Sequence, residues 1–309
     1  MRKFFSIGFV SGILLFPLPS HGLVTGNYTA AEDDPLLYGY SISWNQVYRV
    51  NASAGGGTGV PVSLYWLLTA KHVADDKTPA EVQVGSSIYT AVNVFYHPQA
   101  DLALLQFSTP VFSSGHYPLY TGTFPVSPRL EGVLVGFGYN GTVSSHYYTP
   151  STGGHNVKRW GTNMIDGTAD NVVIGSTTND VIYMNFDSGD SPYEAGLATY
   201  DSGGPVLVND SGVWKLAGIN IAIGRHRSGT PSGSFDRLYA VRIPAYADWI
   251  TNTIPEPNTT VLLAVSAVVA SLRRFKRSGA PRAKFTPRPE PPRFPTVYLR
   301  RQNRRCHYL

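Results

Sequence analysis

Cysteine is almost absent from the sequence, because Cys306 is the only one in 309 residues. No disulfide can therefore form within the chain, and stability must come from packing. The part between the two terminal segments, about 230 residues, is long enough to bury a sufficient core without covalent cross-links. The scarcity of cysteine thus excludes a small disulfide-stapled scaffold.

Charged residues are also scarce, since they make up only 15% of the chain, whereas 42% is hydrophobic. The formal net charge of +5 is unevenly distributed. Residues 273–309 carry twelve Lys or Arg against one acid, Glu290, whereas residues 23–254 carry eleven Lys or Arg against eighteen acids, a balance of −7. A folded nucleic-acid-binding domain needs a basic face. The acidic body therefore argues against nucleic acid as a partner.

The first 22 residues have the three parts of a secretory signal peptide. A basic start precedes an apolar stretch from Phe4 to Phe16, and small residues, Ser20 and Gly22, occupy the positions that determine cleavage. A buried first helix is the alternative, but the apolar stretch is short and adjoins this cleavage-like site. We therefore expect residues 1–22 to be removed on export.

Residues 253–277 combine a Pro-Glu-Pro motif, an apolar run from Val261 to Leu272 and a basic cluster at 273–277. This order resembles the PEP-CTERM sorting signal of Gram-negative bacteria. The resemblance implies cleavage by an exosortase, a cell-surface or extracellular destination, and a transmembrane helix held only transiently in the inner membrane. The apolar run of about twelve to fourteen residues is short for a stable span of roughly 20.

Residues 278–309 are rich in Pro and Arg, a composition that cannot bury a core. We expect a disordered basic tail. PEP-CTERM tags usually end soon after the basic cluster, so this tail departs from their pattern.

The body of the chain, residues 23–252, shows short apolar or alternating runs rather than helical periodicity. Such runs, separated by Gly, Asn, Asp and Pro, are typical of antiparallel strands in a barrel or sandwich. One helix is expected over residues 244–251, where Tyr246, Trp249 and Ile250 could face inward. The expected strands include residues 82–84, 91–96, 102–107, 133–135, 181–185, 206–208 and 216–223.

Three motifs occur in the order His, Asp, Ser. An L-L-T-A-K-H segment ends at His72, a D-L-A-L-L segment begins at Asp101, and a D-S-G-G-P segment places Ser202 beside paired glycines that permit a tight turn. Each motif alone also fits a structural role, such as a capping residue or an ordinary turn. Together and in this order they favour nucleophilic catalysis.

The three motifs resemble the T-A-A-H, D-I-A-L and G-D-S-G-G-P motifs of the chymotrypsin (trypsin-like) serine protease family. Residues 239–242 and 247–250 resemble its closing segment, so the resemblance covers roughly residues 23–252. It implies an all-β domain of two packed six-stranded antiparallel β-barrels with a short C-terminal helix and a cleft between the barrels. It also implies a serine endopeptidase that acts on protein or peptide substrates.

The resemblance makes Ser202 the nucleophile, His72 the general base and then acid, and Asp101 the carboxylate that orients the imidazole. A serine hydroxyl is a poor nucleophile near neutral pH, so a base within hydrogen-bond reach must take its proton. Imidazole suits this role because its ordinary pKa lies near ambient pH. No cofactor or metal is expected, since the other histidines of the body lack metal-ligand spacing.

The family's oxyanion hole corresponds to the backbone N–H groups of Ser202 and Tyr200. Tyr200 stands where the family has glycine, and a bulky residue is expected to resist the backbone geometry that aims this N–H inward. The loss of one donor costs ~10² to 10³ in rate. The alternative is a hole that is completed only when substrate binds.

Asp201 corresponds to the family residue whose carboxylate pairs with a newly freed N-terminus. The L-V-T-G segment that begins at Leu23 resembles the I-V-G-G start of the family's active enzymes. Cleavage after Gly22 by signal peptidase would then create this terminus, without a separate activating protease.

Gly196, six residues before the serine, corresponds to the base of the family's specificity pocket. Because no acid occupies this position, we expect an apolar or aromatic side chain in the pocket rather than Lys or Arg. Glu194 or Asp190 would enter the pocket if the loop alignment shifted.

Two other classes of function remain open at this point. The first is a catalytically silent, protease-like binding module at the cell surface, which the bulky Tyr200 favours. The second is a structural protein that the apolar segment from Val261 to Leu272 anchors permanently in the membrane.

Overall fold

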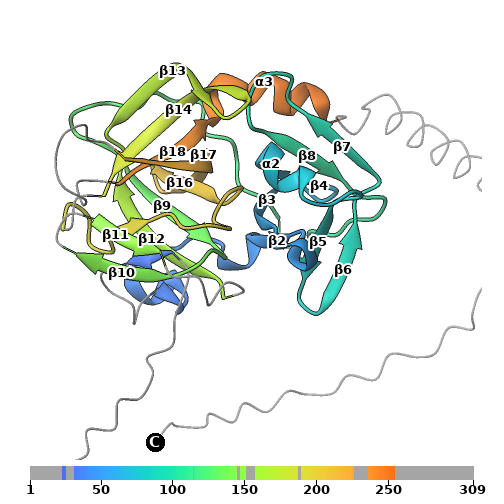
Figure 1. Ribbon diagram of the computed structural model, residues 1–309, viewed down its shortest axis with the longest axis horizontal. Coiled ribbons are helices and arrows are strands. Elements are labelled where there is room, and N and C mark those ends of the chain that lie inside the picture. The colour runs from blue at the N-terminus through green and yellow to red at the C-terminus, as the bar shows by residue number, and fades with distance from the viewer. Residues whose placement is uncertain are drawn as a thin grey trace, which may run out of the picture. The chain divides into compact units, whose positions relative to one another are not determined.

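The computed structural model describes residues 23–25, 31–113, 115–144, 147–150, 157–186, 189–225 and 236–254. The expected signal peptide, the Pro-Glu-Pro motif with its apolar run and basic cluster, and the basic tail lie outside these residues. Within them, two antiparallel β-sheets dominate (Figure 1). No helix in these ranges has both the length and the apolar character needed to cross a bilayer.

The first sheet has the strand order β6-β5-β2-β3-β4-β8-β7. The strands at its two edges, β6 and β7, follow one another in the chain. Ala91, between them, donates a backbone hydrogen bond to Ala80, and Val92 donates one to Gln106. The sheet is thereby closed into a barrel. Its strands are β2 (Tyr48–Val50), β3 (Gly57–Ser63), β4 (Trp66–Thr69), β5 (Glu81–Val84), β6 (Ser87–Thr90), β7 (Asn93–Tyr96) and β8 (Ala103–Gln106).

The second sheet has the order β12-β9-β16-β17-β18-β14-β13 and closes in the same way. Between its edge strands, Ile165 donates to the carbonyl of Leu130 and Asp166 donates to that of Tyr183. Its strands are β9 (Glu131–Gly136), β12 (Arg159–Met164), β13 (Gly167–Ile174), β14 (Thr177–Asn185), β16 (Pro205–Asp210), β17 (Val213–Arg225) and β18 (Asp236–Arg242).

The expected fold of two barrels is confirmed, but each sheet has seven strands instead of six. The physical reason is a local break in one edge run of each barrel. Residues 91–92 and residues 165–166 turn their backbone groups from one neighbouring strand to the other, so a single continuous strand becomes two. The smaller pairs outside the barrels are β1 (Val24–Thr25) with β15 (Ala195–Gly196), and β10 (Gly141–Ser144) with β11 (Tyr147–Pro150).

Helices are few, as expected. The predicted C-terminal helix is α3 (Ile243–Thr253), with Tyr246 and Ile250 buried and Trp249 half-buried. The rings of Tyr246 and Trp249 contact His97, so α3 packs against the end of β7 in the first barrel (Figure 1). The other helices whose bounds the structure describes are α2 (Lys71–Asp75), η1 (Pro35–Tyr38), η2 (Trp44–Gln46) and η3 (Ala52–Ala54). Of these, α2 positions a residue of the candidate site.

Candidate active site

His72 and Asp101 come from neighbouring parts of the first barrel and meet at its rim. β4 ends at Thr69 and α2 begins at Lys71, so His72 lies in the first turn of this short helix. The His72 backbone N–H donates to Asp101 Oδ1 at 3.0 Å, and His72 Nδ1 lies 2.7 Å from Asp101 Oδ2. The carboxylate therefore fixes both the backbone and the ring of the histidine.

Asp101 is itself held by a residue of the second barrel. Its backbone N–H donates to Asn179 Oδ1 at 2.7 Å, and the Asn179 side chain is fully buried in β14. This contact links the loop before β8 to the second barrel. Sequence reasoning missed Asn179, because a single Asn within a strand has no pattern that points to a distant partner.

The His72 imidazole has competing influences on its protonation. Partial burial lowers its pKa, whereas the hydrogen bond to Asp101 raises it. The negative charges of Asp101, Asp76 and Asp75 act in the same direction as this hydrogen bond, so the pKa of His72 lies above the ordinary value of 6.5. The acidic surroundings thus favour the imidazolium form.

Ser202 lies in a tight turn just before β16. Gly203 has φ of +82°, and a Cβ there would collide with the Thr58 carbonyl oxygen, which explains the glycine. The Thr58 N–H donates to the Ser202 carbonyl at 2.8 Å, and the Gly203 N–H donates to the Asn220 carbonyl at 2.8 Å. The turn is therefore fixed by backbone bonds from both barrels.

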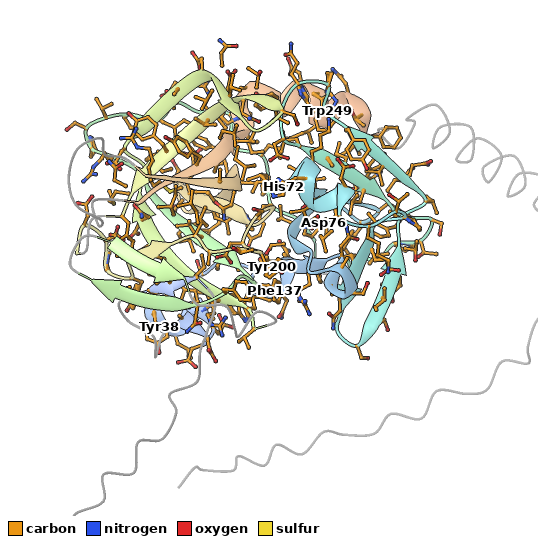
Figure 2. The ribbon with its side chains drawn as sticks, in the orientation of Figure 1. Tyr38, His72, Asp76, Phe137, Tyr200 and Trp249 are labelled. Carbon is orange, nitrogen blue, oxygen red and sulfur yellow. The ribbon has the colours of Figure 1, made fainter. Side chains whose placement is uncertain are left out.

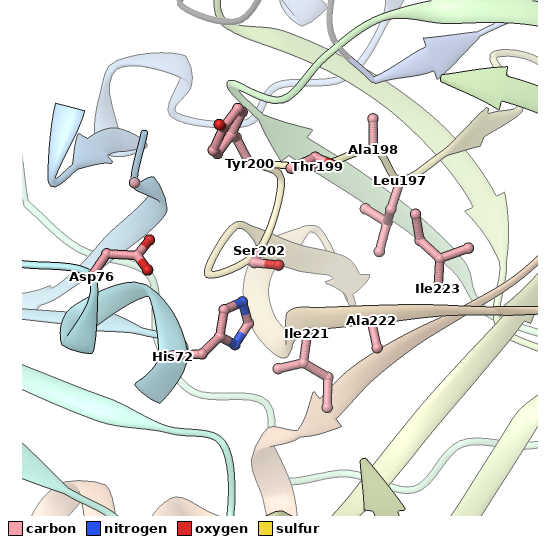
Figure 3. Close-up of a pocket in the computed structure, with 11 residues that line it drawn as sticks. His72, Asp76, Leu197, Ala198, Thr199, Tyr200, Ser202, Ile221, Ala222 and Ile223 are labelled. Carbon is pink, nitrogen blue, oxygen red and sulfur yellow. The ribbon is translucent and has the colours of Figure 1, made fainter. Parts of the chain in front are cut away.

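Ser202 and His72 line one cavity of about 500 Å³, the Ser202 cavity. Figure 3 shows the His72 ring below the Ser202 turn, with one ring nitrogen directed toward it. Since Nδ1 is engaged by Asp101, the nitrogen on this side is Nε2. The structure thus brings the three sequence-predicted residues together. The cavity is lined by Gly56, His72, Asp76, Leu197, Ala198, Thr199, Tyr200, Ser202, Ile221, Ala222 and Ile223.

Tyr200 adopts the backbone conformation that glycine usually provides. Its φ is +78°, in the left-handed region. Its carbonyl accepts a hydrogen bond from Thr58 Oγ1 at 3.1 Å, and its ring lies 4.9 Å from that of Tyr139 in an edge-on arrangement. These contacts hold a conformation that costs an L-residue about 1–2 kcal/mol.

Asp201 is fully buried beneath the turn. Its carboxylate accepts backbone hydrogen bonds from Gly138 and Ala198, both at 2.8 Å, and from Leu23. A Cβ on Gly136 or Gly138 would collide with this carboxylate, so the two glycines form its cradle. Burial raises the pKa of Asp201 to about 7, although the three backbone N–H groups counteract this.

The predicted pocket residue Gly196 lies in β15, where it pairs with Val24 of β1. The lining of the Ser202 cavity begins at the next residue, Leu197, and its far end is apolar (Figure 3). Glu194 accepts hydrogen bonds from Ser191, and Asp190 pairs with Arg129 at 2.8 Å. Neither acid is among the residues that line the cavity.

The apolar end of the Ser202 cavity was only partly expected. Its wall is formed by Leu197 and Ala198 before the serine and by residues 221–223 of β17. The sequence predicted a strand at 216–223 but offered no reason to place it beside the serine. Among the described residues, no group of three or more His, Cys, Asp or Glu side chains is arranged to hold a metal ion.

The chain is similar to known proteins in sequence pattern and in fold. No curated protein matches the chain. Neuropsin, a serine protease expressed in the limbic system of mouse brain, has 18% sequence identity to this chain and a TM-score of 0.50. The match covers 73% of this chain and 98% of the neuropsin chain. Rv3671c from M. tuberculosis H37Rv, solved in an inactive mutant form, has 16% identity and a TM-score of 0.49, covering 72% and 95% respectively.

The likeness to neuropsin concerns the fold alone, because the identity is low. The family described as Trypsin matches residues 39–250, a range that contains His72, Asp101 and Ser202. This match covers more than half of the sequence, and the two barrels have the arrangement that the family predicts. The chain therefore belongs to the trypsin family of serine proteases.

Proposed function

We propose that the protein is a serine endopeptidase that works through an acyl-enzyme intermediate, with Ser202, His72 and Asp101 as its triad. One observation carries the proposal: the two hydrogen bonds between His72 and Asp101 leave Nε2 facing the cavity that contains Ser202. A histidine held in this way is suited to accept the proton of a serine hydroxyl.

In the proposed reaction, Ser202 Oγ attacks the carbonyl carbon of the peptide bond as its proton passes to His72 Nε2. The imidazolium, stabilised by Asp101, then gives that proton to the leaving amine as the C–N bond breaks. Water, deprotonated by His72, hydrolyses the ester and restores the serine. The raised pKa of His72 is compatible with both the base and the acid steps.

The developing oxyanion would be stabilised by the backbone N–H groups of Tyr200 and Ser202. The positive φ of Tyr200 supports this assignment, because it removes the objection that a bulky residue resists a glycine-like conformation. The Thr58 bonds to the Tyr200 and Ser202 carbonyls fix the backbone from which both N–H groups project. We assign Tyr200 and Ser202 as the oxyanion hole on this basis.

The apolar end of the Ser202 cavity would receive the substrate side chain next to the cleaved bond. Leu197, Ala198 and Ile221 offer no charge to Lys or Arg, and they favour an apolar or aromatic side chain. Gly196 would lie behind this wall, in the strand pair with β1.

We also propose that the protein is exported and processed at both ends. Removal of residues 1–22 would leave Leu23 as the N-terminus beside Asp201, and an exosortase would cut near the Pro-Glu-Pro motif at 255–257. Intact-mass measurement of the protein secreted by a Gram-negative host checks both sites. A mature form that keeps residues 261–272 would contradict the transient anchor.

The decisive test of the catalytic proposal is active-site labelling. A fluorophosphonate probe should form a covalent adduct with the wild-type protein and leave Ser202→Ala unlabelled, and turnover should fall by about 10⁴-fold or more in that variant. Ser211→Ala, which removes a serine from the exposed turn between β16 and β17, is the matched control and should label like the wild type. A wild-type protein that stays unlabelled would leave only a binding module.

A further inference from the structure

A second cavity, the Lys158 cavity, has about 560 Å³ and is slightly larger than the Ser202 cavity. Its size falls in the range of about 300–1,000 Å³ that is usual for ligand sites. It is formed by both barrels, from the segment at η2 and β2, the turn between β5 and β6, and the residues after β9 and before β12. The lining residues that matter for its chemistry are Tyr48, Arg49, Val84, Phe137 and Lys158.

The charges in this cavity are all positive. Lys158 and Arg49 are its two charged residues, and no Asp or Glu is among the described residues that line it. Lys158 Nζ donates to the Trp44 carbonyl at 2.9 Å and lies 5.0 Å from the Trp44 ring centroid and 5.6 Å from that of Phe137. The ammonium is therefore held by a carbonyl and two ring faces rather than by a carboxylate.

Several other basic side chains of the body are paired with acids, whereas Lys71 lies over the Tyr96 ring and Arg237 over the Tyr183 ring. Five basic side chains form ion pairs with carboxylates: Lys77 with Glu81, Arg129 with Asp166, Arg159 with Glu32, Lys215 with Asp210 and Arg242 with Asp170. In the part of the chain that the structure describes, neither Lys158 nor Arg49 has such a pair. The one side-chain bond of Arg49 there is a long one, 3.5 Å, to the Ala52 carbonyl.

This lack of a counter-charge has a cost. Burial lowers the pKa of Lys158 to about 8 and lowers that of Arg49, because no anion offsets the loss of water. Partly buried cations are usually paired. An anion in the cavity would neutralise the positive charge of Lys158 and Arg49. A carboxylate could bind the planar guanidinium of Arg49 through two hydrogen bonds while it contacts the ammonium of Lys158.

The Lys158 cavity is linked to the turn that holds the serine. Phe137, in its wall, donates its backbone N–H to Thr58 Oγ1 at 3.2 Å, and Thr58 Oγ1 donates to the Tyr200 carbonyl at 3.1 Å. Figure 2 shows Tyr200 and Phe137 in line below His72. In Figure 3, Tyr200 lies away from Leu197 and Ile223, toward the Asp76 side of the Ser202 cavity. A chain that crosses the serine and continues past Tyr200 would thus approach Lys158.

We propose that the Lys158 cavity is an anion-binding exosite that takes an acidic segment of the polypeptide substrate, through Lys158 and Arg49. The role in substrate binding rests on the proposed peptidase function, whereas the anion site itself does not. The rings of Phe137 and Tyr48 and the side chain of Val84 give the cavity apolar surface for the methylenes of glutamate side chains. This combination favours an acidic peptide over a free inorganic anion.

The test uses Ser202→Ala protein, so that no peptide is cleaved during binding. A fluorescent peptide with three consecutive glutamates is compared by anisotropy with the same peptide carrying glutamines. The glutamate peptide should bind at least about tenfold more tightly, and adding Lys158→Met should remove that difference. Lys215→Met removes an equal charge at a paired site and should leave it unchanged. Equal binding of the two peptides, or equal effects of the two lysine variants, overturns the proposal.

A second readout avoids the risk that Lys158→Met perturbs folding. An amine with a pKa of about 8 is acylated rapidly near neutral pH, and mass spectrometry locates the modified lysine. The glutamate peptide should protect Lys158, and the glutamine peptide should not. Affinity should fall as the pH rises from about 7 to 9, because the ammonium is the form that binds. Inorganic phosphate that protects Lys158 as well as the glutamate peptide does, at the same concentration, would overturn the assignment to peptide.

The outcomes for the exosite and for catalysis can be separated. Binding to Ser202→Ala does not require a reactive serine, whereas fluorophosphonate labelling of the wild-type protein does. A protein that binds the glutamate peptide but stays unlabelled would keep the anion site and lose the peptidase. A labelled protein that does not distinguish the two peptides would keep the peptidase and lose the exosite.

Discussion

Asp101 and Asp201 are two buried carboxylates of one site, and their surroundings differ in kind. The Asp101 carboxylate, at the rim of the first barrel, accepts two hydrogen bonds from His72, a residue with half of its side chain exposed. Asp201, inside the second barrel, is fully buried and bound by the backbone N–H groups of Gly138, Ala198 and Leu23. Asp101 thus orients an exposed side chain, whereas Asp201 accepts hydrogen bonds from the backbone.

The two carboxylates therefore have different roles: Asp101 acts on the catalytic imidazole, and Asp201 holds the backbone around the serine. A change at Asp101 should disturb the orientation of one imidazole and leave the barrels intact. A change in the charge of Asp201 should act on the nucleophile turn and on the N-terminal segment together, because its ligands come from three separate parts of the chain. The first barrel thus carries the proton-transfer pair on short connections, while the second builds a buried support for the serine.

The largest effect expected from this comparison is kinetic. Asp101→Asn keeps the size of the side chain but removes the charge that stabilises the imidazolium and selects the tautomer, so turnover should fall by about 10⁴-fold. Steady-state kinetics on a peptide substrate measures this loss. Urea denaturation should show a change of less than about 1 kcal/mol, since the contacts of Asp101 lie at a rim.

A second substitution tests whether the hydrogen bonds of Asp101, rather than its charge alone, cause this loss of turnover. Asp75→Asn is the matched control, because Asp75 acts on His72 only through its charge. It should lower the pKa of His72 slightly and leave turnover near that of the wild type. Equal losses for Asp75→Asn and Asp101→Asn would mean that net charge, rather than the hydrogen bonds to His72, governs activity.

Much of the fold could be predicted from the sequence, because alternating runs and turn residues are local signals. The C-terminal helix and most of the central strands followed from them. The breaks that divide one edge strand of each barrel could not, since they depend on which neighbour accepts the hydrogen bonds of residues 91–92 and 165–166. The pairing of β1 with β15 was equally inaccessible, because two-residue strands carry no periodicity.

The residues of the candidate site also differ in whether a local sequence pattern reveals them. His72, Asp101 and Ser202 were found because each belongs to a short motif. Thr58 and Asn179 were missed, since each acts on a residue far away in the chain, and an isolated Thr or Asn in a strand has no distinguishing pattern. Contacts between the two barrels, such as those of Thr58 and Asn179, cannot be predicted from local sequence patterns.

The second prediction concerns Asp201 and pH. The pKa of Asp201 in the folded chain, about 7, lies above its ordinary value of 3.8, so the folded state holds a proton that the unfolded state releases between these values. The free energy of unfolding should therefore fall as the pH rises from about 4 to 7, by a total on the order of 4 kcal/mol. Chemical denaturation across this range measures the slope for a chain that continues before Leu23.

A chain that begins at Leu23 should behave differently. Its terminal ammonium replaces a neutral amide beside the carboxylate, and an opposite charge at hydrogen-bond distance lowers the pKa of Asp201. The loss of stability between about pH 4 and 7 should then shrink or disappear. Asp201→Asn, which cannot ionise, is the control for both forms. If the longer chain keeps its slope in Asp201→Asn, groups other than Asp201 are responsible. If the two forms lose equal stability between about pH 4 and 7, the pairing of the Leu23 ammonium with Asp201 is wrong.

The smallest expected effect isolates the backbone of Tyr200. Tyr200→Ala and Tyr200→Gly both remove the ring that contacts Tyr139, but only alanine keeps a Cβ at φ of +78°. The glycine variant should therefore be the more stable of the two by about 1 kcal/mol in urea denaturation. Turnover of the glycine variant should equal or exceed that of the alanine variant, because the backbone N–H at position 200 keeps its direction without strain. An alanine variant at least as stable as the glycine variant would show that the left-handed conformation is not maintained in solution.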